Sequence, residues 1–279
     1  MIISPDAPNA ALLERIERFY DAVPRSGARA EDFGPLSLFV REGAGWPYYA
    51  RPALGASAGV TAADVDRVRT RQRELGVPEA FEWTAETAPA LRAAVEESGL
   101  RVNEHPLMVL DTDTVPAAED GPDGVEVRLL PGGDPLLAAS MAVAHLAFGE
   151  PGTAIGSAGA GELAAAVEAA EADGTAQRLT GRIEAGLSAV AVALAADGAL
   201  LGSGQHQWVG EVSELVGIGT LPVARRRGVG RALTARLAAD ARAKGATTVF
   251  LTASDEAVAR VYASAGFRRI ATALIAEPA

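Results

Sequence analysis

Apolar residues follow a helical or a strand spacing along most of the chain. In the first half, helices are predicted where apolar residues recur every three or four positions, and strands where they are contiguous or alternate with polar residues. Helices are expected over residues 12–23, 61–75 and 89–99, and strands over residues 35–42, 79–85 and 105–111. The second of these helices has a start signal of its own, because Thr61 with Asp64 resembles a capping box.

The second half of the chain shows the same mixture of patterns. Helices are expected over residues 134–148, 161–172, 229–244 and 256–266, and strands over residues 125–130, 188–221, 247–254 and 267–277. The long stretch 188–221 is interpreted as a meander of three strands, with Asp197-Gly198 as the first hairpin turn. Together, the elements predict an α/β fold with a mixed sheet.

Residues 116–124 interrupt these patterns. The segment PAAEDGPDG combines prolines, glycines and acidic residues and contains no large apolar side chain, which is typical of a linker. We therefore predict two domains, residues 1–115 and residues 125–279.

The two predicted domains resemble each other. A shift of 167 residues places residues 80–87 over residues 247–254, and Gly99-Leu100 over Gly266-Phe267. Because strand–helix–glycine–strand units are common, coincidence is one interpretation of this match. A duplicated fold is the simpler interpretation.

Charge and composition narrow the class of protein. The 279 residues carry a net charge of −11, and the excess is concentrated in residues 1–123, which hold 21 acidic and 12 basic residues. Such a chain is a poor partner for a phosphate backbone, so no nucleic-acid partner is expected. The absence of cysteine excludes disulfides, zinc–thiolate sites and a catalytic thiol, and no metal is expected.

The N-terminus MIISPDAPNA lacks the basic segment and apolar core of a signal peptide. No uncharged apolar run approaches the ~20 residues that a membrane span needs. We therefore expect a cytoplasmic protein with no membrane partner.

One basic stretch stands out in this acidic chain, ARRRGVGRAL at residues 224–233. A helix start exposes unpaired N–H groups and attracts anions, and Gly228 and Gly230 would let a phosphate approach the backbone. The surrounding arginines are Arg225, Arg226, Arg227 and Arg231. These features describe a pyrophosphate cradle, whereas the alternative interpretation is a solvated basic face beside a tight turn.

This stretch also carries a resemblance to a family. Arg225-Arg226-Arg227-Gly228-Val229-Gly230 matches the (Gln/Arg)-x-x-Gly-x-(Gly/Ala) loop of the GNAT superfamily of acyl-CoA-dependent N-acetyltransferases. Residues 255–262 followed by Gly266-Phe267 resemble the family's Asn-x6-Tyr-x3-Gly-Phe block, and residues 214–220 resemble the central strand before the loop. The resemblance covers roughly residues 125–277 and implies a GNAT acyl-CoA N-acyltransferase fold there.

The resemblance also implies roles for individual residues in binding acetyl-CoA. In the family the sheet splays after the central strand, so backbone groups of Ile218, Gly219 and Thr220 would pair with the pantetheine arm. The N–H groups from Arg226 to Arg231 would hold the pyrophosphate. The residues expected to bind acetyl-CoA are Ile218, Gly219, Thr220, Arg225, Arg226, Arg227, Gly228, Val229, Gly230, Arg231 and Asp255. Asp255 departs from the family, which usually has asparagine there, and adds a charge near the cofactor.

Two residues are candidates for catalysis. Tyr262 resembles the tyrosine that protonates the departing CoA thiolate. Glu214 stands where some family members carry a general base, and alternation would put it on one face with Ile218 and Thr220. A carboxyl near a cleft could have its pKa raised, although a solvated strand-end charge is an equal alternative. Glu211 and a water chain are the other candidates for the base.

The N-terminal half departs from the family at both kinds of site. Val95 occupies the place of Tyr262 in the internal match, and no arginine–glycine loop precedes the corresponding helix. If the repeat is real, residues 1–115 resemble a degenerate GNAT-like domain that has lost acetyl-CoA binding. His206, on a predicted strand of the second half, is a further residue that could face the substrate.

The sequence thus predicts an acetyltransferase in which an amine attacks acetyl-CoA directly in a ternary complex. The acceptor would be a small-molecule or peptide amine, and the protein a monomer or a homodimer. One alternative is a non-catalytic acyl-CoA-binding regulatory module. Another is a serine hydrolase, because residues 55–59 spell the Gly-x-Ser-x-Gly nucleophile-elbow pattern, although the strand–turn–helix context is missing.

Overall fold

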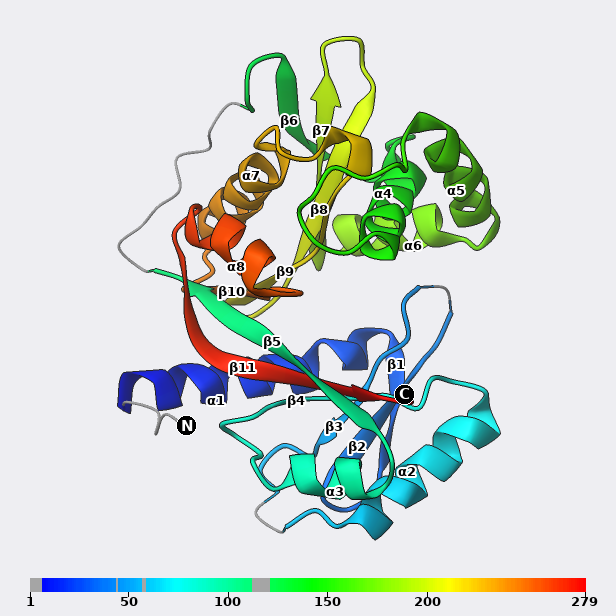
Figure 1. Ribbon diagram of the computed structural model, residues 1–279, viewed down its shortest axis with the longest axis vertical. Helices are drawn as coiled ribbons and strands as arrows, with labels where there is room; N and C mark the ends of the chain where they lie inside the picture. Colours follow the sequence, from blue (N-terminus) through cyan, green and yellow to red (C-terminus); the bar gives the residue numbers. More distant parts are fainter. Residues whose placement is uncertain (1–6, 44, 57–58, 112–120) are drawn as a thin grey trace. The chain divides into compact units, whose positions relative to one another are not determined.

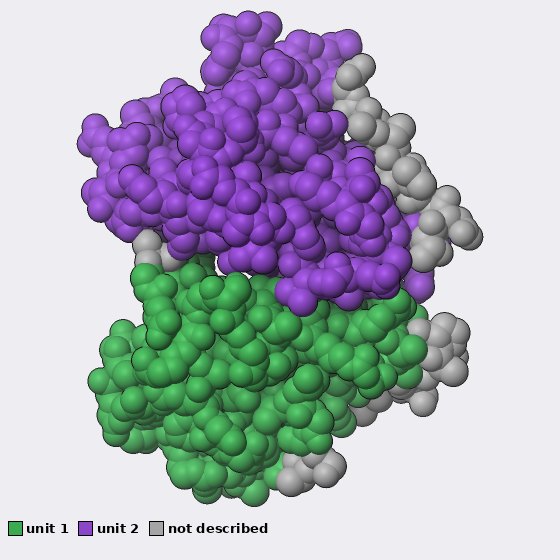
Figure 2. Space-filling model, turned by 180° about the vertical axis from the view of Figure 1, so that it is seen from behind, with its two compact units in different colours: residues 1–107, 270–279 green, residues 108–269 purple. Residues whose placement is uncertain are grey.

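The computed structural model describes residues 7–43, 45–56, 59–111 and 121–279 (Figure 1). The chain divides into two compact units, coloured separately in Figure 2. Unit 1 comprises Met1–Leu107 and Ile270–Ala279, and unit 2 comprises Met108–Arg269. The last ten residues therefore group with unit 1, whereas the sequence pattern assigned them to the second domain. Of the predicted linker, residues 116–120 lie outside the described residues.

Unit 1 is built from three α-helices, six strands and one 3-10 turn in its described residues. The helices are α1 (Ala7–Ala22), α2 (Ala62–Leu75) and α3 (Leu91–Glu97), and the 3-10 turn is η1 (Pro24–Ser26). The strands are β1 (Ala28–Asp32), β2 (Leu36–Arg41), β3 (Ala50–Pro52), β4 (Phe81–Thr84), β5 (Arg101–Leu110) and β11 (Phe267–Glu277). Strands β5 and β11 each cross the boundary between the units.

The strands of unit 1 lie in the order β1-β2-β3-β4-β11-β5. The first three are antiparallel, and β3 pairs with β4 in parallel at one position, Ala50 with Phe81. Ala50 and Phe81 belong to a core with α2 and α3. Their neighbours Arg51 and Glu82 form an ion pair of 2.7 Å, and the Arg51 guanidinium lies over the ring of Tyr20 in α1. Because side chains alternate along a strand, α1 covers the opposite face of the sheet.

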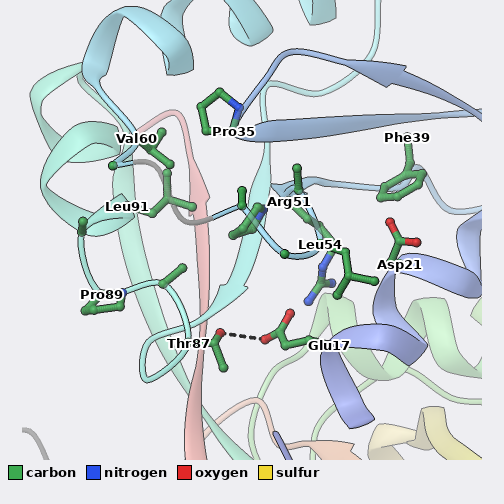
Figure 3. A pocket seen from close by; sticks show the side chains of 17 residues that line it. Glu17, Asp21, Pro35, Phe39, Arg51, Leu54, Val60, Thr87, Pro89 and Leu91 are labelled. Carbon is green, nitrogen blue, oxygen red and sulfur yellow. Dashed lines mark hydrogen bonds between the residues drawn. The ribbon is translucent and has the colours of Figure 1, made fainter. Parts of the chain in front are cut away.

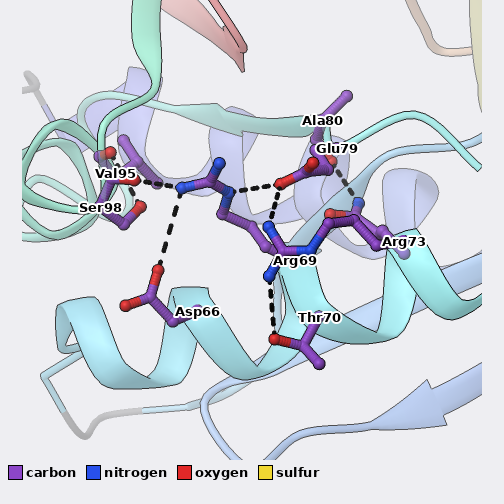
Figure 4. A network of polar contacts seen from close by, with 9 residues as sticks. Asp66, Arg69, Thr70, Arg73, Glu79, Ala80, Val95 and Ser98 are labelled. Atoms are coloured by element: carbon purple, nitrogen blue, oxygen red, sulfur yellow. Dashed lines mark hydrogen bonds and ion pairs between the residues drawn. The ribbon is translucent and has the colours of Figure 1, made fainter.

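Ion pairs fix α2 against the segment that follows it. Arg69 and Arg73 both contact Oε2 of Glu79, at 2.7 and 2.9 Å (Figure 4). Gln72, which is fully buried, donates to the carbonyl of Ala80 at 3.0 Å. The arginines of this helix are therefore neutralised within the unit.

Unit 2 has five α-helices among its described residues: α4 (Leu137–Gly149), α5 (Ala160–Ala172), α6 (Thr175–Glu184), α7 (Val229–Ala243) and α8 (Glu256–Ala263). Its strands, besides the ends of β5 and β11, are β6 (Val125–Leu130), β7 (Ser188–Ala195), β8 (Leu200–Val209), β9 (Val212–Thr220) and β10 (Thr248–Thr252). A 3-10 turn, η2 (Pro222–Ala224), joins β9 to α7.

The sheet of unit 2 has the order β6-β7-β8-β9-β10, followed by the end of β5. Strands β6 to β9 are antiparallel, and β9 pairs with β10 in parallel. Glycines of β8 face α7, since a Cβ at Gly202 would meet Val229 and Leu233. Ser203 points the other way and donates to the carbonyl of Ser140 in α4 at 2.5 Å. Helices therefore cover both faces of the central strands.

The two units follow the same order of elements. In each, a run of three antiparallel strands, β1 to β3 or β7 to β9, is followed by a helix, a parallel strand, another helix and a final strand, and unit 2 has β6 and three helices before that run. Within unit 1, β4 pairs with residues 273–276 of β11, and β10 of unit 2 lies beside the end of β5. This shared order is what a duplicated fold predicts.

Most predicted elements are present within one to three residues of their expected ends. The sequence pattern missed β1, β3 and α6, and β5 begins earlier than predicted, at Arg101. Strand β1 has the sequence ARAED, and its burial does not alternate between core and solvent. Strand β3 is only three residues long. These elements exist because neighbouring strands pair with them, which local hydrophobicity does not encode.

Candidate active site

Strands β9 and β10 separate part of the way along. Their parallel register runs from Val212–Thr248 to Glu214–Phe250, whereas β9 continues to Thr220 with β8 as its partner. The side of β9 that faces away from β8 is thus open for hydrogen bonding beyond Glu214. This is the splay that the resemblance implied, and Ile218, Gly219 and Thr220 lie along it.

A bulge in β9 changes which residues share a face. Gln205 is opposite Val216, but Ser203 is opposite Gly219, so β9 has one residue more than β8 between these pairs. Gly217 has φ of 63° there, a conformation that favours glycine.

The predicted alternation along β9 is therefore wrong beyond the bulge. Glu214 and Gly219 face α4, and a Cβ at Gly219 would lie 2.9 Å from that of Ala147. Thr220 pairs with Gly202 on the α7 face, and Ile218 packs beside Gly204 on that same face. A regular strand would have placed Glu214, Ile218 and Thr220 together.

The chain enters α7 through a tight turn. Arg226 has φ of 66° and Gly228, the residue before the helix, has φ of 80°. The first helical turn has no acidic residue, and its N–H groups lack intrahelical acceptors. Gly230 has room beside it, since a Cβ there would have Thr220 Oγ1 at 3.6 Å as its nearest neighbour. The helix start therefore offers unhindered N–H groups and a positive dipole end to an anion.

The arginines of the loop do not act as one group. Arg225 is buried, and its guanidinium donates to the carbonyls of Ala147, Glu150 and Ala154 at 2.9, 2.5 and 3.2 Å. It holds the end of α4 to the loop rather than pointing to solvent. Arg226 and Arg227 are exposed and form no ion pair with any described residue. Their charge is available to a ligand.

The end of α4 is fixed by a carboxylate as well. Glu150 accepts hydrogen bonds from the N–H groups of Ala158 and Ser157, at 2.8 and 3.1 Å. These two bonds, with a smaller contribution from Arg225, lower the pKa of Glu150. Two side chains of opposite charge, Arg225 and Glu150, thus hold the segment beside the loop through hydrogen bonds to its backbone.

Glu214 lies at the point where the two strands begin to separate. Its side chain is 9% exposed and accepts a hydrogen bond from Gln207 Nε2 at 3.1 Å. Gln207 in turn accepts from Arg182 of α6 at 3.4 Å. The sequence reasoning missed Gln207 and Arg182 because the first lies across the sheet and the second on an unpredicted helix.

Glu211, the alternative base, lies at the other end of β9. It is exposed, and its carbonyl accepts from the N–H groups of Thr247 and Thr248, at 2.8 and 3.1 Å. This position is in the turn before β9, next to the end of the strand that pairs with β10 and away from the splay.

Tyr262 is buried in the core of unit 2 beside Phe267, with ring centroids 6.4 Å apart. Burial, with a smaller contribution from the Asp255 carboxylate, raises the pKa of Tyr262 above the usual 10.0 of a phenol. The phenol is therefore protonated at neutral pH. Within the described residues, its hydroxyl makes no hydrogen bond to another group of the chain.

Asp255 has a structural task in the described chain. It is the N-cap of α8, and its Oδ1 accepts from the N–H groups of Ala257 and Val258 at 2.7 and 2.8 Å. An aspartate or asparagine serves equally well as a cap. The departure from the family's asparagine thus keeps the cap of the helix.

His206 does not face a substrate. It is fully buried and contacts Ser213 Oγ at 2.9 Å and Asp240 Oδ2 at 2.8 Å. It also stacks on Trp208. The histidine therefore links β8, β9 and α7 inside the core.

Metal and membrane sites are not evident in the part of the chain that the structure describes. There, no cluster of three or more histidine, aspartate or glutamate side chains is arranged to hold a metal ion. None of the described helices combines the length and the apolar character needed to cross a bilayer.

A mixed sheet with a splayed parallel pair and a helix start with free N–H groups is an arrangement that can hold an anionic ligand. Comparison with known families specifies the class of protein. Residues 162–267 match the model of the acetyltransferase (GNAT) family. This part of the chain is a GNAT domain, and the activity that the family supports is acyl transfer.

Solved structures share the fold over most of the chain. A GCN5-related N-acetyltransferase from Kribbella flavida aligns with a TM-score of 0.69 and 21% identity, covering 96% of both chains. One from Sphaerobacter thermophilus aligns at 0.56 and 16%, covering 87% of this chain and 80% of its own. A tandem GNAT protein from the clavulanic acid biosynthesis pathway aligns at 0.55 and 18%, covering 86% and 77%. No curated protein matches the chain.

Proposed function

We propose that the protein transfers an acetyl group from acetyl-CoA to an amine, with both substrates bound in the splay between β9 and β10. The observation that carries this proposal is the combination of an unpaired strand edge with the α7 start, where Arg226 and Arg227 are exposed and unpaired within the described chain.

The cofactor would bind through two kinds of backbone group. The open edge of β9 runs along Ile218, Gly219 and Thr220. The backbone groups of this segment that point away from β8 would pair with the pantetheine amides as an added strand does. The N–H groups from Arg226 to Arg231 would hold the pyrophosphate, because the helix dipole and the glycine backbone both favour it. Arg225 supports this loop through its carbonyl contacts rather than by touching phosphate.

Glu214 is the proposed base. It lies where the strands separate, it is largely buried, and Gln207 fixes one of its oxygens. An ammonium acceptor would lose one proton to Glu214, and the neutral amine nitrogen would then attack the thioester carbon. Glu211 is disfavoured by its place in the exposed turn before β9, away from the splay.

Tyr262 is the proposed acid. As the C–N bond forms and the C–S bond breaks, the thiolate would take the phenolic proton, and the phenolate would regain one from the amide nitrogen. The products are then an acetamide and free CoA, with the acceptor's first proton released from Glu214 to solvent. The raised pKa of Tyr262 keeps this proton in place until the thiolate leaves.

Calorimetric titration with acetyl-CoA tests the cofactor site. Wild type is expected to bind one molecule per chain, and Gly230→Asp to lose at least a hundredfold in affinity, because a carboxylate at the helix start would repel the pyrophosphate. An acid in the first turn stabilises a helix, so the loss is not expected from unfolding. Gly230→Ala is the matched control, since its Cβ has room.

The same titration addresses unit 1. We propose that unit 1 is a degenerate copy of the domain that does not bind acetyl-CoA, and a stoichiometry of two would contradict this. Absence of binding by the folded wild-type chain would reject the transferase proposal. Binding without turnover of any small-molecule or peptide amine would instead favour a regulatory acyl-CoA-binding module.

A serine hydrolase finds no support in the described residues. The Gly-x-Ser-x-Gly pattern at residues 55–59 lies partly outside them, at 57–58. The chain before it leaves β3 at Pro52, and α2 begins only at Ala62, so no sharp strand-to-helix turn carries the pattern.

A further inference from the structure

Unit 1 contains a cavity of about 270 Å³ (Figure 3). Its walls come from α1, from β2 and β3, from residues 53–56 and 59–60, and from the segment before α3. The volume is near the lower end of the range for small-molecule sites. A small organic molecule therefore fits better than a nucleotide cofactor.

The cavity occupies a special place in the fold. Strands β3 and β4 form the parallel pair of unit 1, and they pair at a single position before separating. The cavity is lined by residues that follow each of these strands, among them Ala53 and Thr87. Ligands of open α/β sheets bind at the carboxyl ends of parallel strands. By element order, the same place in unit 2 is the splay between β9 and β10.

The charge at this cavity is the opposite of that at the unit 2 loop. Helix α2 starts with its own carboxylate, because Asp64 Oδ2 accepts from the backbone N–H and the hydroxyl of Thr61 at 2.8 and 2.6 Å. The residue at the same place of α7, three positions after the cap, is Arg231. The carboxylate of Asp64 therefore already occupies the N-terminus of α2, which disfavours a second anion there.

Two acids and one arginine line the cavity. Asp21 is paired with Arg25, at 2.7 and 3.0 Å, and the Arg51 charge is matched by Glu82 at 2.7 Å. Glu17 contacts the hydroxyl of Thr87 at 2.8 Å (Figure 3) and forms no ion pair with any described residue. One negative charge therefore faces the cavity without an ion pair to any residue that the structure describes.

The rest of the lining is apolar. Figure 3 shows Glu17 and Asp21 projecting from α1 on one side, and Val60, Pro89 and Leu91 on the other. A ligand that satisfies both sides has a cationic end and an apolar body. We propose that this cavity is a binding site for a small organic cation, an ammonium on an apolar body, whose charge pairs with Glu17.

The test uses 2-phenylethylamine as the probe and the methyl NMR signals of Leu54 and Leu91 as reporters, in the full-length protein. The neutral analogue 2-phenylethanol and the anion 3-phenylpropionate have the same apolar body. The amine is expected to shift both reporters saturably and to bind about tenfold more tightly than the alcohol, since one ion pair distinguishes them. Equal binding of amine and alcohol, or tighter binding of the anion, would overturn the proposal.

Two variants test whether Glu17 supplies the negative charge that binds the amine. Glu17→Gln keeps an acceptor for Thr87 and is expected to weaken amine binding about tenfold, whereas Glu14→Gln on the same helix should not, because Glu14 is exposed and pairs with Arg18. Unchanged amine affinity in Glu17→Gln would contradict the role of Glu17.

The site is independent of the proposed acetyl-CoA site, and the experiment separates the two. Gly230→Asp should bind the amine at the unit 1 reporters as wild type does. Acetyl-CoA alone should leave those reporters unshifted, and a shift at Leu54 and Leu91 would assign the cavity to acyl-CoA instead and refute the cation proposal.

Discussion

The helix that joins the last antiparallel strand to the parallel strand begins differently in the two units. In unit 1 it starts with Thr61 and Asp64, which bond to each other and fill the helix N-terminus with a carboxylate. In unit 2 it starts with Gly228, no acid, and Arg231 in the position of Asp64. The order of elements is the same, so the fold alone does not set the ligand. A few residues at one helix start decide whether an anion is accepted.

The arginines show a second difference. Those of α2 all pair with carboxylates: Arg69 and Arg73 with Glu79, and the other two with Asp64, Glu31 and Glu74. The unit 2 loop instead divides its arginines between a buried anchor and exposed charges. An arginine cluster in a sequence therefore predicts an anion-binding site only when the carboxylates and carbonyls around it are known.

The largest expected effect concerns the buried and the exposed arginines of the unit 2 loop. Arg225→Ala should lower the free energy of unfolding by about 3 kcal/mol, because three carbonyls lose a charged donor. Arg227→Ala should leave it unchanged and weaken acetyl-CoA binding about tenfold. Chemical denaturation and calorimetry measure the two quantities. If Arg225→Ala unfolds like wild type, its carbonyl contacts are not structural.

The second prediction concerns Tyr262, whose place in unit 1 is taken by Val95. Tyr262→Phe should lower kcat about a hundredfold, the range of acid catalysis, and leave the Kd for acetyl-CoA unchanged. Tyr48→Phe in unit 1 is the control. A variant as fast as wild type would remove the acid role and make the two units more alike.

The third prediction concerns the base. Glu214→Gln should reduce turnover about tenfold at neutral pH, and the defect should shrink at alkaline pH, where the acceptor amine is already neutral. Glu211→Gln should have no effect. The pH dependence of kcat/KM for the three proteins decides between the candidates, and a defect in Glu211→Gln alone would reverse the assignment.

The smallest effect is expected at the α2 start. Thr61→Ala should cost about 1 kcal/mol of stability at neutral pH, as lost caps do. The Thr61 hydroxyl is the first cause of the lowered pKa of Asp64, with the Thr61 N–H and Arg67 contributing as well. Because the pKa of Asp64 is lower in the folded protein, its ionised carboxyl stabilises the fold at pH values above the usual pKa of 3.8. This stabilisation is lost as the pH falls through the folded-state pKa.

The difference between wild type and Thr61→Ala should accordingly narrow in acid. Thermal unfolding of both proteins across that range measures it, with Thr70→Ala on the same helix as a control. A gap that widens in acid would show that the cap does not act through the Asp64 carboxylate.

The sequence by itself determined the elements that depend on local patterns. Capping residues, turn glycines and apolar spacing are encoded in neighbouring positions, so α2, the hairpin at Gly198 and the α7 start could be predicted. The motif at Arg225–Gly230 pointed to the GNAT family for the same reason, since its function depends on a few consecutive residues.

Only the tertiary structure decided which side chains meet. The bulge at Gly217 moved Thr220 to the α7 face, a change that depends on pairing with β8. Arg225 turned inward because the end of α4 and the segment after it present three carbonyls to it, and the pairing of β4 with β11 joins strands far apart in the chain. Hydrogen bonds across a sheet join residues far apart in the chain, and no local pattern records them.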